Sequence, residues 1–246
     1  MQNYRSGFSS TPPVVKNLII INTLMLVATY ILSLRGIDLA NTLGLHYFAS
    51  ERFRPFQLVT HMFMHGGIIH LFFNMFALWM FGRVLESVWG PKRFFIFYFV
   101  TGLGAAALHL FVNFLEFHSL AGKMTPEMVN IVLQQGADAL DQGKNFTDPL
   151  MAKLNGIINI PTIGASGAVY GVLLGFGMLF PNTELMLLFP PIPIKAKYFV
   201  IGYGVLELYL GLTQSASNIA HFAHLGGMLF GFILIKYWNK NSRNFY

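Results

Sequence analysis

One serine in this chain stands where its hydroxyl group could act as a nucleophile. Ser166 lies in the segment Gly164-Ala165-Ser166-Gly167, at the predicted start of an apolar helix. The free backbone N–H groups and the positive end of the helix dipole at such a start can stabilise an oxyanion. Because Gly164 and Gly167 leave the backbone beside the serine uncovered, a substrate carbonyl group can approach it. Taken alone, a Gly-x-Ser-Gly segment is also typical of close packing between membrane helices.

Histidine side chains can supply the base that such a serine needs, and they gather in two predicted helices. The first holds His61, His65 and His70, with Asn74 beside them, and the second holds His221 and His224. Intervals of four residues, between 61 and 65 and between 70 and 74, predict that each pair shares a helical face. Two other interpretations stay open, which are hydrogen bonds between helices and a metal site. Against a metal, the sequence has no HExxH segment, and neither helix contains an aspartate or glutamate.

The composition places these helices in a membrane. Of the 246 residues, 54% are hydrophobic and only 11% are charged, which is too few polar groups to cover a water-soluble fold. Apolar stretches of about 17 to 25 residues, each long enough to cross a bilayer as a helix, recur along the chain. They predict an all-α polytopic membrane protein with six spans, at residues 18–34, 57–81, 94–115, 166–180, 198–212 and 218–238. The first span is expected to be a retained helix, because no small-residue cleavage site follows it.

Basic residues predict the orientation of these spans. They concentrate on the side of the two termini, as Arg5, Lys16, Arg83, Lys92, Arg93, Lys195, Lys197, Lys236, Lys240 and Arg243. By the positive-inside rule both terminal tails, residues 1–17 and 239–246, are expected in the cytoplasm. The basic residues that produce the net charge of +6 are scattered between apolar stretches. This distribution favours anionic lipid headgroups over nucleic acid as their partner. The absence of cysteine excludes disulfides, thiolate metal sites and cysteine nucleophiles.

A polar insertion lies between the third and fourth spans of the predicted membrane domain, residues 18–238. It covers residues 117–161 and on this topology is extracytoplasmic. Thr125-Pro126 and Asp148-Pro149 each pair a capping side chain with a proline at the first helical position, so two short helices are expected there. The stretch 35–56, rich in aromatic and arginine residues, is expected to lie at the outer face of the membrane as an amphipathic loop.

Three motifs, taken together, resemble those of the rhomboid family of intramembrane serine proteases. They are HxxxN at His70 to Asn74, GxSG at Gly164 to Gly167 and AHxxGxxxG at Ala223 to Gly231, in this order on the predicted spans. The resemblance covers residues 18–238 apart from most of 117–161, and it implies a six-helix bundle with an extended loop between helices three and four. The chain departs from the family in two places. Its first outer loop lacks the Trp-Arg pair of many relatives, and its polar insertion is longer than in the simplest members.

The resemblance implies a role for each matching residue. Ser166 would be the nucleophile and His224 the general base, as a dyad without a third, acidic member. His70, Asn74 and the backbone N–H of Ser166 would bind the oxyanion. Tyr170 would pack on the catalytic imidazole. The positions expected to support the site are His61, His65, Gly164, Gly167, Gly171, Gly227 and Gly231, and those interpreted as structural are His221, Arg83 and Glu86.

The implied function is cleavage of a peptide bond in or near a transmembrane helix of another protein, through an acyl-enzyme. No cofactor and no metal are implied, small side chains are expected at the cleavage site, and the oligomeric state stays open. The expected location is a bacterial inner membrane. A non-proteolytic rhomboid-like binding or quality-control protein is the main alternative. A transporter with a histidine proton relay is a more distant one, because Glu207 is the only acidic residue well inside a span.

Overall fold

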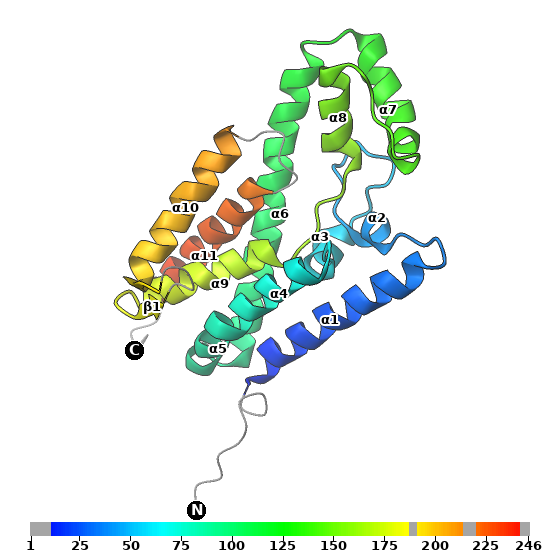
Figure 1. Cartoon of the computed structure of the whole chain (residues 1–246). Helices are drawn as coiled ribbons and strands as arrows, with labels where there is room; N and C mark the ends of the chain where they lie inside the picture. Colours follow the sequence, from blue (N-terminus) through cyan, green and yellow to red (C-terminus); the bar gives the residue numbers. More distant parts are fainter. Residues whose placement is uncertain (1–10, 187–190, 214–219, 242–246) are drawn as a thin grey trace, which may run out of the picture.

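The fold is an all-α bundle with one short β-hairpin, seen in a computed structural model that describes residues 11–186, 191–213 and 220–241 (Figure 1). Arg5, Arg243 and the expected start of the last span at Asn218 lie outside the described residues. In chain order the helices are α1 (Pro13–Ser33), α2 (Leu39–Leu43), α3 (Gln57–Thr60), the 3-10 turn η1 (His61–Phe63), α4 (Ile68–Ala77), the π-helical turn η2 (Leu78–Gly82), α5 (Arg83–Trp89), α6 (Pro91–Ala121), α7 (Pro126–Asp141), α8 (Pro149–Asn159), α9 (Ser166–Leu179), α10 (Ala196–Thr213) and α11 (His221–Asn241). Strands β1 (Glu184–Met186) and β2 (Pro193–Lys195) pair antiparallel between α9 and α10, with Glu184 opposite Lys195.

Three helical segments in the described part of the chain are long and apolar enough to cross a membrane. They are Pro13–Ser33, Ile68–Trp89, which runs through α4, η2 and α5, and Pro91–Ala121. The other three predicted spans correspond to α9, which is apolar but has only 14 residues, and to α10 and α11. Large apolar side chains such as Leu24 and Ile68 are exposed, by 60% and 78% of their surface. Such a surface fits lipid rather than water, so the chain is a multi-pass membrane protein.

The second predicted span is not one continuous helix, which corrects the expectation for residues 57–81. Helix α3 passes into η1, Met64 has extended backbone, and α4 starts only at Ile68. The interruption falls at Gly66 and Gly67, where two glycines in a row carry the highest entropic cost of helix formation. His61 and His65 therefore do not share a helical face, because His65 lies in the connection between the helices.

Helices α6, α9 and α11 pack together at the centre of the bundle, with α10 on one side and α1, α4 and α5 on the other (Figure 1). Phe97 and Tyr98 on α6 and Val172 on α9 have no exposed surface in this core. Glu86 is also buried, and its carboxylate accepts hydrogen bonds from the backbone N–H groups of Val14 and Val15 at 2.9 and 2.8 Å. The interpretation of Glu86 as structural now has a physical reason, because it caps the start of α1.

The two helices predicted in the polar insertion are present as α7 and α8. Thr125 Oγ1 accepts a hydrogen bond from Met128 N–H, and Asp148 Oδ1 accepts from the N–H groups of Leu150 and Met151. Both caps therefore form where the sequence predicts them. Helix α6 runs to Ala121, past its predicted end at residue 115, because Leu120 packs in a second apolar cluster with side chains of α7 and α8.

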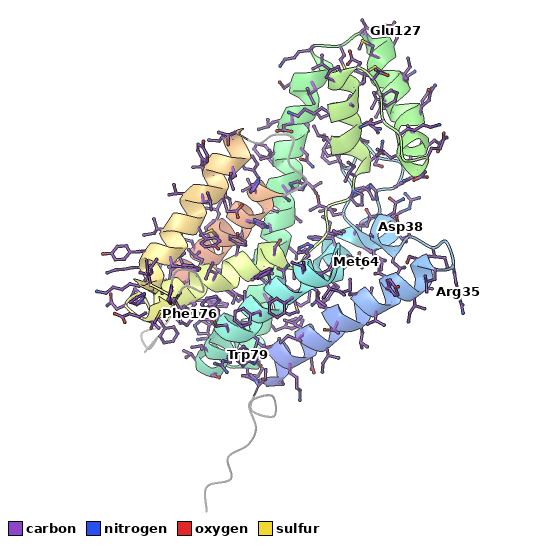
Figure 2. All side chains as sticks on the ribbon, viewed as in Figure 1. Arg35, Asp38, Met64, Trp79, Glu127 and Phe176 are labelled. Atoms are coloured by element: carbon purple, nitrogen blue, oxygen red, sulfur yellow. The ribbon has the colours of Figure 1, made fainter. Side chains whose placement is uncertain are left out.

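Stretch 35–56 holds the helix pair α7 and α8 against the rest of the molecule. Arg52 makes two hydrogen bonds to the carboxylate of Asp141, at 3.0 and 2.6 Å, and Ser50 Oγ donates to Asn159 Oδ1 at 2.9 Å. Leu45 forms an isolated β-bridge with Thr162, just before the segment that contains Ser166. Figure 2 labels Glu127 on α7 at the far end of the molecule from Trp79. The insertion is thus a pair of helices, and stretch 35–56 holds the C-terminal ends of both.

Candidate active site

Ser166 begins α9 and lines a cavity of about 1780 Å³. No side chain caps this helix at Ala165, which leaves the N–H groups of the first turn to other partners. Gly164 has a φ of +135°, and a Cβ atom there would lie 3.0 Å from His70 Nε2 and 3.5 Å from Ser166 Oγ. Glycine is therefore required at 164 by its backbone conformation and by the approach of two polar side chains.

His224, in the first turn of α11, faces Ser166. Its Nε2 atom lies 2.8 Å from Ser166 Oγ, although 58 residues separate the two in sequence. The ring of Tyr170, one turn after Ser166 on α9, stacks on the His224 imidazole with centroids 4.2 Å apart and planes within 5°. This contact restricts the imidazole to an orientation in which one nitrogen points at the serine hydroxyl.

Glycine pairs bring α9 and α11 into backbone contact. A Cβ atom on Gly227 would overlap the carbonyl oxygen of Gly167, and one on Gly231 would lie 3.5 Å from the Cα atom of Gly171. Gly171 also faces α6, where a Cβ atom would meet the side chain of Thr101 at 2.5 Å. The glycines named from the sequence thus allow the close approach that joins Ser166 to His224.

His70 and Asn74 on α4 line the same cavity as Ser166. The backbone N–H of Gly66 donates to His70 Nδ1 at 3.4 Å, so the ring proton of a neutral His70 stands on Nε2, the atom that approaches Gly164. Asn74 Nδ2 donates to the His70 carbonyl oxygen at 3.0 Å. His70 therefore offers an N–H group beside Gly164, just before α9, and Asn74 offers an amide in the same cavity.

The two remaining histidines of the first group differ in their contacts. His61 is buried, its Nδ1 lies 2.8 Å from the Gln57 carbonyl oxygen, and its own carbonyl accepts a hydrogen bond from Gly164 N–H at 3.0 Å. His61 thus fixes the segment that precedes Ser166. His65 packs its ring against His70, with centroids 5.0 Å apart, and its two ring nitrogens have no hydrogen-bond partner among the described residues.

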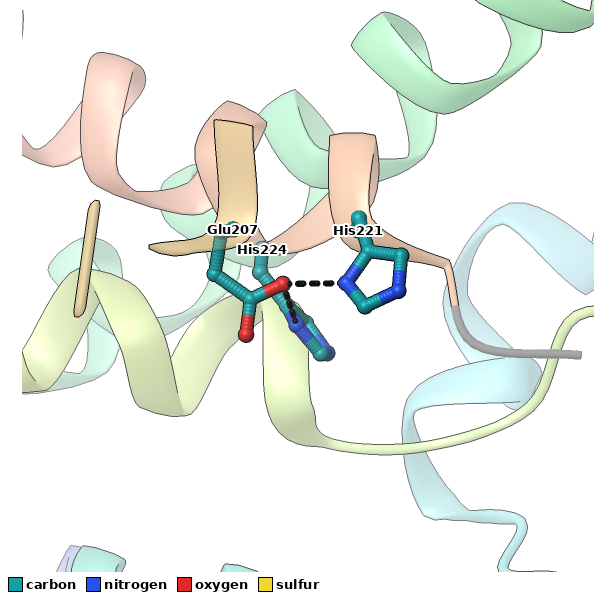
Figure 3. Close-up of side chains that lie close together, drawn as sticks. All are labelled: Glu207, His221 and His224. Carbon is teal, nitrogen blue, oxygen red and sulfur yellow. Dashed lines mark hydrogen bonds and ion pairs between the residues drawn. The ribbon is translucent and has the colours of Figure 1, made fainter. Parts of the chain in front are cut away.

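An acidic residue lies beside the two histidines of α11, a neighbour that the sequence analysis did not expect, while the Ser166–His224 dyad stays a prediction. Glu207, on α10, has its Oε2 atom 3.0 Å from His224 Nδ1 and 2.7 Å from His221 Nδ1 (Figure 3). Tyr170 Oη donates to the other carboxylate oxygen at 2.5 Å. One signal was present in the sequence, because a glutamate well inside an apolar helix is costly without partners. The pairing of α10 with α11 could not be read from the sequence.

The same three groups are the candidates for a metal. Glu207, His221 and His224 each offer one ligand atom, and these atoms all lie within 4.8 Å of one another. His221 Nδ1 makes a hydrogen bond of 2.7 Å with Oε2, whereas His224 Nδ1 lies 3.0 Å from Oε2 without a hydrogen bond among the described residues. A bound ion would have to replace both contacts.

His109 on α6 is a cavity residue that the sequence analysis missed. Its Nε2 lies 2.7 Å from Thr162 Oγ1 and 3.2 Å from Asn113 Nδ2. The signal was available, since a histidine inside an apolar span is expensive to bury. The contact with Thr162 joins α6 to the segment that leads into Ser166.

Comparisons with known proteins agree on one family. A family model described as the rhomboid domain matches residues 52–240. The chain is 30% identical over 176 residues to RHOMBOID-like protein 12, mitochondrial, and 42% identical over 178 residues to RHOMBOID-like protein 6, mitochondrial, both from Arabidopsis thaliana. It is 25% identical over 177 residues to the rhomboid protease GluP of Bacillus subtilis. These matches cover 71%, 72% and 72% of this chain but only 44%, 42% and 24% of the relatives, which are longer.

Proposed function

The chain belongs to the rhomboid family, and from this premise we propose that it is an intramembrane serine endopeptidase. The observation that carries the proposal is the 2.8 Å contact between Ser166 Oγ and His224 Nε2 at the start of α9. A serine hydroxyl is a weak nucleophile until a base takes its proton, and this contact provides the base.

The proposed reaction begins when Ser166 Oγ attacks the scissile carbonyl carbon while its proton passes to His224 Nε2. The oxyanion that forms can accept hydrogen bonds from the Ser166 N–H, from His70 Nε2–H and from the Asn74 amide. His224 then gives the proton to the leaving amine as the C–N bond breaks. A water molecule, deprotonated by His224, hydrolyses the acyl-enzyme and restores the serine.

The proposed substrate is a transmembrane segment of another protein. The cavity beside Ser166 is bordered by apolar side chains of α4 and α9, including Phe73, Phe76 and Leu173. An apolar segment can occupy such a surface, but its helix must first unwind locally because helical carbonyl groups are already hydrogen-bonded. We therefore expect cleavage near helix-weakening residues and next to small side chains.

The relatives do not agree on which cellular membrane contains the protein. Two of them carry the word mitochondrial in their names, and a third is bacterial. The bacterial inner membrane accordingly stays a prediction, as does the placement of both termini in the cytoplasm.

The test is cleavage of a single-span membrane protein by the purified chain in lipid vesicles. Wild type is compared with Ser166→Ala and with Ser87→Ala, which removes an exposed hydroxyl that donates to the Arg83 carbonyl oxygen at 2.7 Å. We expect product with wild type and Ser87→Ala and none with Ser166→Ala. Equal cleavage by all three would contradict the proposal, and a wild type that binds such proteins without cutting them would favour a non-proteolytic role.

A further inference from the structure

The cavity that contains Ser166 continues beyond the reacting groups into the polar insertion. Its far part is bordered by α8 and by the C-terminal half of α6, two helices that pack against each other (Figure 1). Segment 160–164, which joins α8 to the start of α9, lines the same cavity. The proposed reaction uses no residue of α8, so it does not account for this part of the cavity.

One face of α8 lines the cavity, and the opposite face packs in the insertion. The cavity residues have the spacing of a single helical face: Pro149, Ala152, Lys153, Gly156, Ile157 and Ile160. By contrast, Met151, Leu154 and Ile158 are buried in the second apolar cluster, with side chains of α7 and the end of α6. The packing of the insertion therefore leaves a continuous face of α8 turned toward the cavity.

Gly156 lies in the middle of this face, and packing does not require a glycine there. A Cβ atom at 156 would meet only Ile160 Cδ1, at 3.7 Å, which is an ordinary contact. Gly136 on α7 differs, because a Cβ atom there would overlap the side chain of Asn155. The space beside Gly156 belongs to the cavity, so a larger side chain at this position would project into it.

The cavity changes from apolar to polar along its length. Beside α4 it is bordered by Phe73 and Phe76, whereas beside the insertion it is bordered by Glu116 of α6 and Lys153 of α8. Both charged side chains are half-buried, and neither has an ion-pair partner among the described residues. A transmembrane substrate has the same change of character, since its apolar span is followed by a polar segment outside the membrane.

We propose that α8 and the C-terminal half of α6 form a groove that binds the extracytoplasmic segment next to the transmembrane span of the substrate, as an extended polar peptide. The inference rests on the proposed protease function and on the predicted topology. The α8 face from Pro149 to Ile160 is about 16 Å long at about 1.5 Å per residue, so about five extended residues can lie along it. Lys153 pairs there with an acidic residue of the substrate, and Glu116 with a basic one.

The first test fills the groove with Gly156→Trp. Two single-span substrates are compared in lipid vesicles, one with about ten residues outside the cut and one with about two, which reach at most about 7 Å. We expect KM for the long substrate to rise by about tenfold or more with kcat within about twofold, and the loss to be absent for the short one. Gly202→Trp, on α10 where nothing lies within 4 Å, is the control and should cleave both as wild type does. Equal losses on the two substrates, or none on the long one, would overturn the groove.

The second test exchanges charges across the groove and does not depend on Gly156→Trp folding. An aspartate or a lysine is placed in turn at each position of the long outer segment. At one place in that segment, wild type should favour aspartate over lysine by about threefold to tenfold in kcat/KM, and Lys153→Glu should reverse the preference. Lys123→Glu makes the same change at an exposed position of the insertion outside the cavity and should keep the wild-type preference. A preference that Lys153→Glu leaves unchanged would contradict the proposal.

The third test separates the groove from the protease function, because it needs no cleavage. A photoreactive residue replaces Ile157 in Ser166→Ala, and the uncut long substrate is crosslinked in vesicles. The crosslink should fall in the outer segment of the substrate, and the same probe in place of Glu127, on the exposed surface of α7, should give none. A wild type that cleaves neither substrate would count against the protease function alone. Failure of the probe at 157 to crosslink a substrate that wild type cleaves would overturn the groove alone.

Discussion

Gly227 on α11 lies so close to Gly167 on α9 that a Cβ atom on Gly227 would overlap the Gly167 carbonyl oxygen. Gly227→Ala must therefore push the two helices apart, at a cost of about 1 to 3 kcal/mol for overpacking. Because a displacement of about 1 Å between reacting groups can cost about a hundredfold in rate, we expect both a lower thermal midpoint and a large loss of cleavage. The control is Gly202→Ala on α10, where nothing lies within 4 Å of the new methyl group. Equal behaviour of the two variants would show that the contact between α9 and α11 does not align the site.

Asn74→Ala tests the proposed oxyanion site. Loss of one donor should lower turnover by about tenfold to a thousandfold, less than loss of Ser166 or His224, because the other donors remain. Asn22→Ala is a matched control, since Asn22 Nδ2 also donates to the carbonyl four residues earlier, at 2.8 Å, but in α1. Turnover is measured per folded molecule, so that any loss of stability is separated from loss of catalysis. An unchanged rate in Asn74→Ala would remove this side chain from the site.

The site residues could be predicted from the sequence because their motifs lie on separate helices with definite spacings. Ser166 at a helix start and Tyr170 one turn later follow from helical geometry, and the structure brings both to His224. The helix caps at Thr125 and Asp148 could also be predicted, because capping is a local interaction.

The features that the sequence analysis did not find depend on contacts between distant segments. Glu207 meets His224 only because α10 packs beside α11, and no local pattern reports that pairing. The break before α4 was missed because residues 57–81 are apolar enough to read as one span, although Gly66 and Gly67 mark the interruption. The ordered motifs, through their resemblance to a family, therefore pointed to the reacting groups, while tertiary packing decides what surrounds them.

The ion pair between Arg52 and Asp141 should make the helix pair α7 and α8 sensitive to acid. The hydrogen bonds from Arg52 hold the pKa of the Asp141 carboxyl below its usual range. Because this pKa is lowered by folding, the stabilisation is complete above the unfolded value, about 3.9, and is lost as the pH falls through the folded value. The side chains are exposed, so the contribution is about 1 kcal/mol or less.

Asp141→Asn should therefore slightly speed proteolysis within the insertion at pH 5 to 7, where about 1 kcal/mol at most is lost. It should make little difference once the pH lies below the lowered pKa of Asp141. Asp138→Asn removes the same charge from the exposed face of the same helix and serves as the control. A difference between Asp141→Asn and wild type that persists in acid would show that the ion pair is not its cause.

Single cysteines test the predicted topology, since the chain has none of its own. A membrane-impermeant maleimide should label Glu127→Cys, on the exposed surface of α7, in intact cells. Lys240→Cys, on the exposed side of the last turn of α11, should react only after the membrane is opened. The positive-inside rule sets this expectation, because basic residues border the ends of the chain. The reverse pattern would invert the orientation.

The most direct test of Ser166 as an activated nucleophile is the position of a covalent adduct. In a fluorophosphonate probe, the phosphorus atom bonds to the serine oxygen, fluoride leaves and the serine proton passes to the base. Peptide mass spectrometry of the labelled wild type should show one adduct, on Ser166. The adduct should be absent from Ser166→Ala, greatly slowed in His224→Ala and retained in Ser87→Ala, because nucleophile and base act as one unit. An adduct on another residue, or labelling of His224→Ala at the rate of the wild type, would contradict the account.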